Sequence, residues 1–127
     1  QRSFEPSQVA FCATGTNVEF CGSEGGGFVV KIHGAVGLTG TKARLKIEFA
    51  GVAGIRVDDP SDRLASPEKP VRLVEQSPWR EQSLAEYVHR FGTKLLPAVA
   101  SIRHYVVQGQ EIAIAVLARK ISITEAQ

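Results

Sequence analysis

Apolar and polar residues alternate from position 28 to position 49, and this is the clearest pattern in the chain. A period of two on both sides of a glycine-bounded turn at residues 37–40 predicts a β-hairpin. If Leu38 and Thr39 are the central turn residues, three apolar pairs lie on one face: Phe28 with Phe49, Val30 with Ile47 and Ile32 with Leu45. This face is expected in the core, because the register of a half-buried hairpin follows its apolar residues.

A second hairpin is predicted near the C-terminus, where apolar runs at residues 102–108 and 111–118 flank Gly109 and Gln110. Glycine as the first central residue suits a type II′ turn. The predicted register pairs Tyr105 with Ile114 and Val107 with Ile112 on one face, and Val106 with Ala113 and Ile102 with Leu117 on the other. Both faces are mainly apolar, so both need cover from a helix, a second sheet or a partner subunit.

One amphipathic helix is predicted between the two hairpins. Ser77 is suited to cap its first turn, Pro78 to occupy the first helical position, and Gly92 to end it. Glu86 stands four residues before Arg90, a spacing that favours an ion pair along the helix. The residues at helical spacing on its apolar face are Leu84, Val88, Phe91 and Leu95.

The order of these elements, strands, then a helix, then strands, predicts an α+β fold. Its antiparallel β-sheet is built from hairpins, with one main helix inserted before the C-terminal hairpin. The chain has 127 residues, enough for one hydrophobic core, so residues 1–127 are expected to form a single globular domain. Residues 1–27 are interpreted as a candidate disulfide-linked hairpin with a glycine-rich connector, and residues 58–70 as part of a long surface loop.

Two cysteines, Cys12 and Cys21, permit one disulfide bond. A turn at Thr16 and Asn17 would place them opposite each other, at a cross-strand separation that a disulfide can span. Two buried free thiols are the alternative, and no CxxC motif favours redox or nucleophilic chemistry. The chain contains no methionine and starts at Gln1, which fits a processed, secreted or extracytoplasmic protein as well as a trimmed chain.

Composition narrows the class of protein. Hydrophobic residues make up 43% of the chain, too many for disorder to be expected, yet no segment approaches the roughly 18 uninterrupted apolar residues of a membrane span. The formal net charge of +2 argues against a dedicated nucleic-acid-binding domain, which is usually strongly basic. We therefore expect a globular domain without a membrane span.

A basic surface is predicted on the solvent face of the first hairpin. Its candidate ligand-binding residues are Lys31, His33, Lys42, Arg44 and Lys46. The predicted register sets Lys31 opposite Lys46, His33 opposite Arg44, and Lys42 opposite Ala35. Like charges that face each other across strands cost stability. An anionic ligand (nucleic acid, an acidic glycan or a phospholipid head group) would offset this cost, as would the acidic loop at residues 58–62; a solvated face with splayed side chains is the third interpretation.

The sequence contains no convergent catalytic or metal-binding motif. Its three histidines, His33, His89 and His104, belong to different elements and lack the close spacing of a zinc site. The glycine run at residues 22–27 leads into a strand and contains a carboxylate, so it is interpreted as a connector and not as a phosphate-binding loop. The sequence therefore implies no cofactor and no metal.

These observations favour a non-enzymatic interaction or assembly module that self-associates or binds a protein partner through its β-sheet. The residues predicted at this interface are Tyr105, Val107, Ile112, Ile114 and Val116. The first alternative is an anion-binding domain that uses the basic hairpin face, and the second is a small enzyme with a cysteine or histidine base. Trp79 is expected to pack into the core, whereas an exposed Trp79 would be a candidate contact hot spot.

Overall fold

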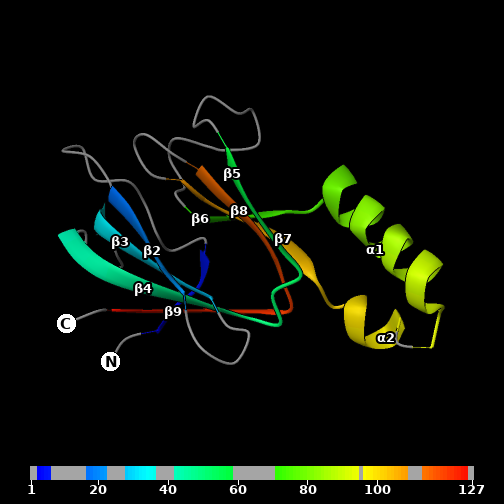
Figure 1. The fold of residues 1–127 in the computed structure, drawn as a ribbon. Coiled ribbons are helices and arrows are strands. Elements are labelled where there is room, and N and C mark those ends of the chain that lie inside the picture. The colour runs from blue at the N-terminus through cyan, green and yellow to red at the C-terminus, as the bar shows by residue number, and fades with distance from the viewer. Residues whose placement is uncertain are drawn as a thin grey trace.

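The computed structural model describes residues 3–6, 17–22, 28–36, 42–58, 71–94, 96–108 and 113–125. Two antiparallel β-sheets face each other, and two helices extend from one end of them (Figure 1). The predicted α+β class is confirmed, because the sheets are built from antiparallel hairpins and the main helix precedes the C-terminal hairpin.

Sheet A holds the first hairpin and both ends of the described chain. Its strand order is β1 (Ser3–Phe4), β9 (Lys120–Glu125), β4 (Lys42–Ala50), β3 (Phe28–Val36) and β2 (Asn17–Gly22). Sheet B has the order β5 (Gly54–Asp58), β8 (Ala113–Ala118), β7 (Arg103–Gln108) and β6 (Val71–Val74). The helices are α1 (Pro78–Phe91) and the short α2 (Leu96–Val99), which connect β6 to β7.

The register predicted for the β3–β4 hairpin is confirmed from Phe28 to His33. Beyond His33 the prediction was wrong: the register shifts before Ala35, so Lys42 lies opposite Val36 and not Ala35. The shift occurs at Gly34, and a glycine inside a strand is a common site for such a bulge because it has no side chain to pack.

The predicted register of the β7–β8 hairpin was wrong by two residues. Tyr105 pairs with Val116 and Val107 with Ile114, and the described strands end at Gln108 and start again at Ala113. A shift of two residues keeps every side chain on its predicted face. Ile112 lies outside the described residues.

The main core lies between the two sheets. Sheet B contributes Val71, Tyr105, Val107, Ile114, Val116 and Ala118, and sheet A contributes Val30, Ile32, Leu45, Ile47, Phe49 and Ile123. The rings of Phe49 and Tyr105 meet across the sheets with centroids 5.8 Å apart. The described residues of the predicted interface, Tyr105, Val107, Ile114 and Val116, are therefore core residues and offer no contact surface. Sheet A of the same protomer covers this face, so the second sheet is the cover present among the alternatives of a helix, a second sheet or a partner subunit.

Burial of Tyr105 has a consequence for alkaline stability. Desolvation raises the pKa of its phenol above the usual 10.0, and the positive charge of Arg103 offsets this only in part. The folded state therefore favours the neutral phenol, and its stabilising effect is complete below pH 10 and decreases above it, where the unfolded chain ionises first.

We expect Tyr105→Phe to lose less stability than the wild type between about pH 9 and about pH 11. The measurement is the urea midpoint of both proteins at several pH values in this window. Tyr87→Phe is the matched control and should follow the wild type, since Tyr87 lies on the surface helix α1. Parallel curves for Tyr105→Phe and the wild type would contradict the prediction.

Candidate functional site

Helix α1 begins and ends as predicted from its caps. Ser77 has an extended backbone, and its hydroxyl oxygen accepts a hydrogen bond from the backbone N–H of Arg80 at 3.0 Å. Pro78 occupies the first turn, where no backbone N–H is needed. At the other end the N–H of Gly92 donates to the carbonyl of Val88 at 2.8 Å.

The first turn of α1 is packed against sheet B through Trp79. The indole meets the buried ring of His104 edge-on, with centroids 5.1 Å apart, and the guanidinium of Arg56 lies 4.7 Å from the indole centroid. Gly54 leaves space for the ring, since a Cβ at this position would come within 3.2 Å of it. Trp79 thus packs against the cluster of Val74, Val106, Ala113 and Ala115, as expected for a core residue.

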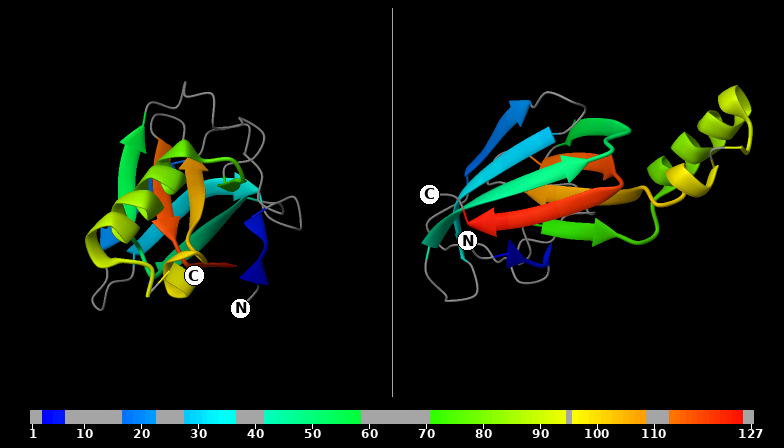
Figure 2. Two further views of the ribbon diagram at one scale, coloured as in Figure 1. Left: turned by 90° about the vertical axis from the view of Figure 1, so that its right-hand side faces the viewer. Right: turned by 90° about the horizontal axis from the view of Figure 1, so that it is seen from below.

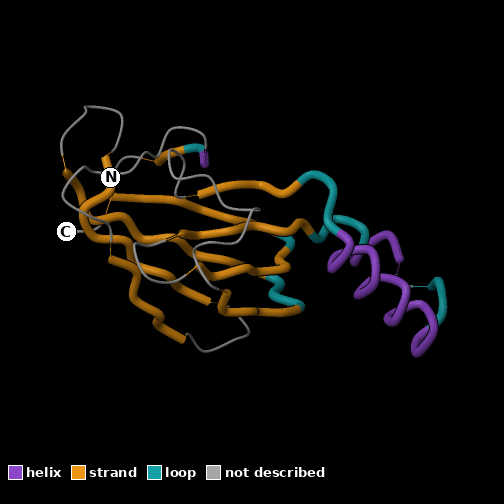
Figure 3. The backbone as a smooth tube through the Cα atoms, turned by 90° about the horizontal axis from the view of Figure 1, so that it is seen from above, coloured by secondary structure: helices purple, strands orange, loops and turns teal. Residues whose placement is uncertain are grey.

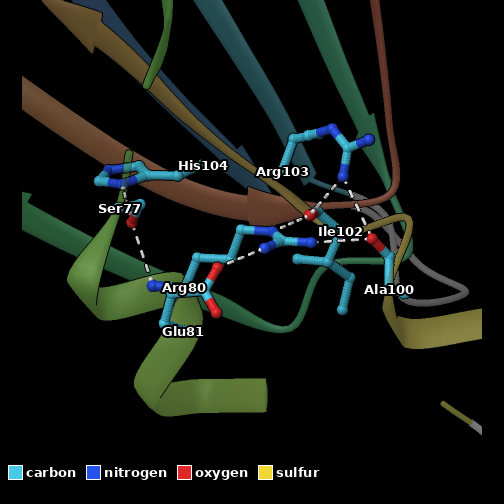
Figure 4. A network of polar contacts seen from close by, with 7 residues as sticks. All are labelled: Ser77, Arg80, Glu81, Ala100, Ile102, Arg103 and His104. Atoms are coloured by element: carbon cyan, nitrogen blue, oxygen red, sulfur yellow. Dashed lines mark hydrogen bonds and ion pairs between the residues drawn. The ribbon is translucent and has the colours of Figure 1, made fainter. Parts of the chain in front are cut away.

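A polar network reinforces this attachment (Figure 4). The hydroxyl of Ser77 is hydrogen-bonded to Nδ1 of His104 at 2.7 Å, and both residues are almost fully buried. Arg80 donates from Nε to the carbonyl of Ile102 and from Nη2 to the carbonyl of Ala100. Its Nη1 forms an ion pair with Glu81 at 2.8 Å. The network therefore ties the start of α1 to the turn that precedes β7.

Beyond this first turn, α1 extends away from the sheets. Two further views show α1 and α2 beyond the end of the β-strands (Figures 2 and 3). None of the fourteen residues of α1 is fully buried. Its apolar residues Leu84, Tyr87 and Val88 are half-buried, and Phe91 is 62% exposed.

A groove of about 330 Å³ lies between α1 and the end of sheet B. We call it the α1 groove. Its apolar lining comes from one side of α1, from the turn around α2 and from the ends of the strands: Leu84, Tyr87, Phe91, Val99, Ile102, Leu117 and Ala53. Its polar lining is Arg80, Ser83, Glu86 and Arg90. The groove is therefore suited to hold an apolar group rather than to carry out acid–base chemistry.

The charged residues that line the α1 groove are Arg80, Glu86 and Arg90, whereas Arg103 and Arg119 lie outside its lining. Within the described residues, Glu86 and Arg90 form no ion pair with each other or with other groups, so the predicted pair along the helix is not formed. Arg103 donates from Nη1 to the carbonyls of Ala100 and Ile102, at 3.1 and 3.3 Å. Arg119 donates from Nε to the hydroxyl of Ser101 at 3.3 Å.

The basic hairpin face keeps its predicted pairs, Lys31 opposite Lys46 and His33 opposite Arg44. One carboxylate of the same strand accompanies Lys46, whose Nζ lies 3.0 Å from Oε1 of Glu48. This ion pair reduces the cost of placing Lys46 opposite Lys31, so an anionic ligand is not required to offset it.

The predicted disulfide falls partly outside the described chain. Cys21 pairs in register with Val29 of β3, while Cys12 lies outside the described residues, as do Asp59 and Asp62 of the acidic loop. The Cys12–Cys21 bond stays a prediction.

Sequence reasoning found the helix but missed the groove beside it. The Ser77–His104 and Arg80–Ile102 contacts join residues more than twenty positions apart, and periodicity carries no signal for such contacts. The apolar stripe of α1 was visible, but a stripe alone does not show whether the protomer covers it.

Comparison with protein-family models, curated proteins and solved structures gave no match. In the described ranges, no three His, Cys, Asp or Glu side chains gather as a metal site. Nor does the described part of the chain contain a helix long and apolar enough to cross a membrane. The function is therefore argued from the α1 groove itself.

Proposed function

We propose that this chain is a non-enzymatic binding module that docks an apolar segment of a protein partner in the α1 groove. The observation that carries the proposal is that no residue of α1 is fully buried, although one of its sides is apolar. A surface helix of a globular protein normally packs this side against its own domain. A groove of about 330 Å³ also falls within the usual size of binding sites.

The proposal keeps the interaction role predicted from the sequence but moves its surface from the sheet to the helix. The core-facing side of sheet B is buried, whereas Phe91 and the neighbouring groove residues are accessible. An exposed apolar surface of this kind marks interaction sites more often than single exposed side chains do. Self-association, an extracytoplasmic location and the disulfide remain separate predictions.

We expect the uncharged fluorescent dye Nile red to bind saturably to the wild-type chain and at least about tenfold more weakly to Ser83→Trp. Ser83 lines the groove, so an indole at this position fills the space that an apolar ligand would take. The measurement is a fluorescence titration at constant protein concentration, with circular dichroism to verify the fold.

Gln82→Trp is the matched control, since Gln82 is the exposed neighbour that does not line the α1 groove. It adds the same side chain to the same helix and should bind the dye like the wild type. Equal dye binding by Ser83→Trp and Gln82→Trp, or no saturable binding by the wild type, would refute the proposal.

A further inference from the structure

We infer that the partner docked in the α1 groove is a second copy of this chain, whose own helix α1 lies antiparallel to the first. This inference rests on the proposed function and names its partner. Phe91 of each copy enters the groove of the other, so the pair has a two-fold axis and uses the same surface twice. Three features of α1 carry the inference: its position, its apolar side and two of its charges.

Helix α1 stands where a second copy can reach it. Its first turn is attached to sheet B through Trp79 and Arg80, and the rest extends beyond the ends of the strands (Figures 2 and 3). The helix has 14 residues and is therefore about 21 Å long. In an antiparallel pair the two attached turns lie at opposite ends, which keeps the β-sheets of the two copies apart. A parallel pair would bring them together at the same end.

The apolar side of α1 is complementary to itself in the antiparallel direction. Leu84, Tyr87, Val88 and Phe91 follow one another at the spacing of one helical side. A two-fold axis between Tyr87 and Val88 places Phe91 of the second copy opposite Leu84, which lines the groove. Phe91 is 62% exposed in one protomer, and this arrangement covers it in both copies. An identical chain thus supplies a matching site for the exposed phenyl ring.

The charged residues that line the groove are balanced in number. Arg80 is paired with Glu81, so Glu86 and Arg90 remain, one of each sign. Both are exposed and lie on the same side of α1, four positions apart. Within the described part of the chain they form no ion pair with each other or with other groups. The groove therefore has no excess charge that would repel a second copy.

These two charges favour the antiparallel direction. Around the two-fold axis, the side of α1 that carries them meets the same side of the second helix in reverse order. Glu86 then lies beside Arg90 of the second copy, and Arg90 lies beside its Glu86, which gives two ion pairs between the copies. A parallel pair would set like charges against each other, at a cost in affinity. The charge pattern of α1 is therefore complementary to an antiparallel copy of itself.

The oligomeric state of the whole chain tests the inference. Sedimentation equilibrium between about 10 µM and about 1 mM protein should show a monomer–dimer equilibrium of the wild type. We expect a dissociation constant in the micromolar range, because one helix and one groove form a small interface. The dimer should become weaker as salt increases.

Charge exchange identifies the surface. Glu86→Arg should weaken the dimer at least about tenfold, because the new arginine faces Arg90 of the second copy, and Arg90→Glu should do the same by bringing two carboxylates together. Glu86→Arg combined with Arg90→Glu should recover the dimer. An equimolar mixture of the two single variants should form a heterodimer, since a basic side then meets an acidic one. Glu75→Arg is the matched control: it makes the same charge change at an exposed position before α1 and should dimerise like the wild type.

The Nile red titration separates the groove from the partner. Ser83→Trp should lose the dimer together with dye binding, whereas Gln82→Trp should keep both. A wild type that binds the dye but stays monomeric over the whole concentration range would overturn the inference and leave the proposed function standing. No dye binding and no dimer would overturn both.

Two other outcomes also count against the inference. A dimer that Glu86→Arg and Arg90→Glu leave unchanged would show that the copies pair through another surface. A dimer with the expected charge dependence but without dye binding by the wild type would show that the helices pair outside the groove, and docking in the groove would be wrong.

Discussion

Replacing Phe49 with alanine should lower the free energy of unfolding by about 3–5 kcal/mol. Phe49 is 2% exposed and lies in β4 between the two sheets. Its ring meets Phe28 at 6.4 Å and Tyr105 at 5.8 Å between centroids. The substitution removes a large apolar side chain and leaves a cavity that rigid strands on both sides cannot close, so both the transfer and the cavity costs apply.

Equilibrium unfolding in urea measures this loss. Because small domains are stable by only about 5–15 kcal/mol, the variant should unfold at a much lower urea concentration. Phe28→Ala is the matched control: Phe28 is half-buried at the margin of the same cluster, so its loss should be clearly smaller. Equal losses at both positions, or a loss below about 1 kcal/mol for Phe49→Ala, would mean that the two sheets do not share this core.

Trp79→Ala should cause the second largest loss of stability. We expect this loss to be concentrated in α1 and not spread evenly along the chain. Trp79 is half-buried, so we expect a loss of about 2–4 kcal/mol, somewhat below that of a fully buried aromatic residue. The described attachment of α1 to sheet B depends on its first turn, through Trp79, Ser77 and Arg80. A helix of this length is marginally stable by itself in water. Loss of the indole should therefore release α1 first.

Amide hydrogen exchange can distinguish local release from global unfolding. In Trp79→Ala, we expect the α1 amides to lose most of their protection while the amides of β7 and β8 keep theirs to a larger extent. Leu84→Ala, one turn further along α1, should change the protection of α1 much less, because Leu84 borders the groove. Equal loss of protection in α1 and in sheet B would contradict this separation.

In the β3–β4 hairpin, the local alternation of apolar and polar residues was sufficient to predict most of the strand pairing. Its apolar residues alternate along both strands, and together with a turn centred on Leu38 and Thr39 they indicated the register that pairs Val30 with Ile47 and Ile32 with Leu45, so this pairing was predicted correctly. The deviation at Gly34 was not predicted, because a bulge changes the register without changing the composition.

The β7–β8 hairpin marks the limit of the same reasoning. Both of its faces are apolar, so registers that differ by two residues bury the same side chains, and turn chemistry alone had to decide between them. The sequence also left open which elements cover the two apolar faces of this hairpin. Sheet A covers the face with Tyr105 and Val107, and Trp79 packs on the opposite face at Val106.

The candidate site depended even more on long-range contacts. The helix, its cap at Ser77 and its end at Gly92 follow from local residues. The groove depends on how far α1 tilts away from sheet B, and this is set by contacts of its first turn with His104 and Ile102. The hydrogen bonds of Arg103 to the carbonyls of Ala100 and Ile102 likewise depend on the folded turn before β7.

The amino-acid sequence by itself determined which segments become strands and helix and which side of each is apolar, because these properties depend on neighbours within a few positions. Only the tertiary structure decided which apolar surfaces the protomer buries and which it leaves accessible. That outcome depends on contacts between residues far apart in the chain. Each such contact gains free energy from burial and costs chain entropy, and no local pattern of residues shows the balance between the two. Sheet A of the same protomer covers one face of sheet B, whereas the apolar side of helix α1 stays partly exposed.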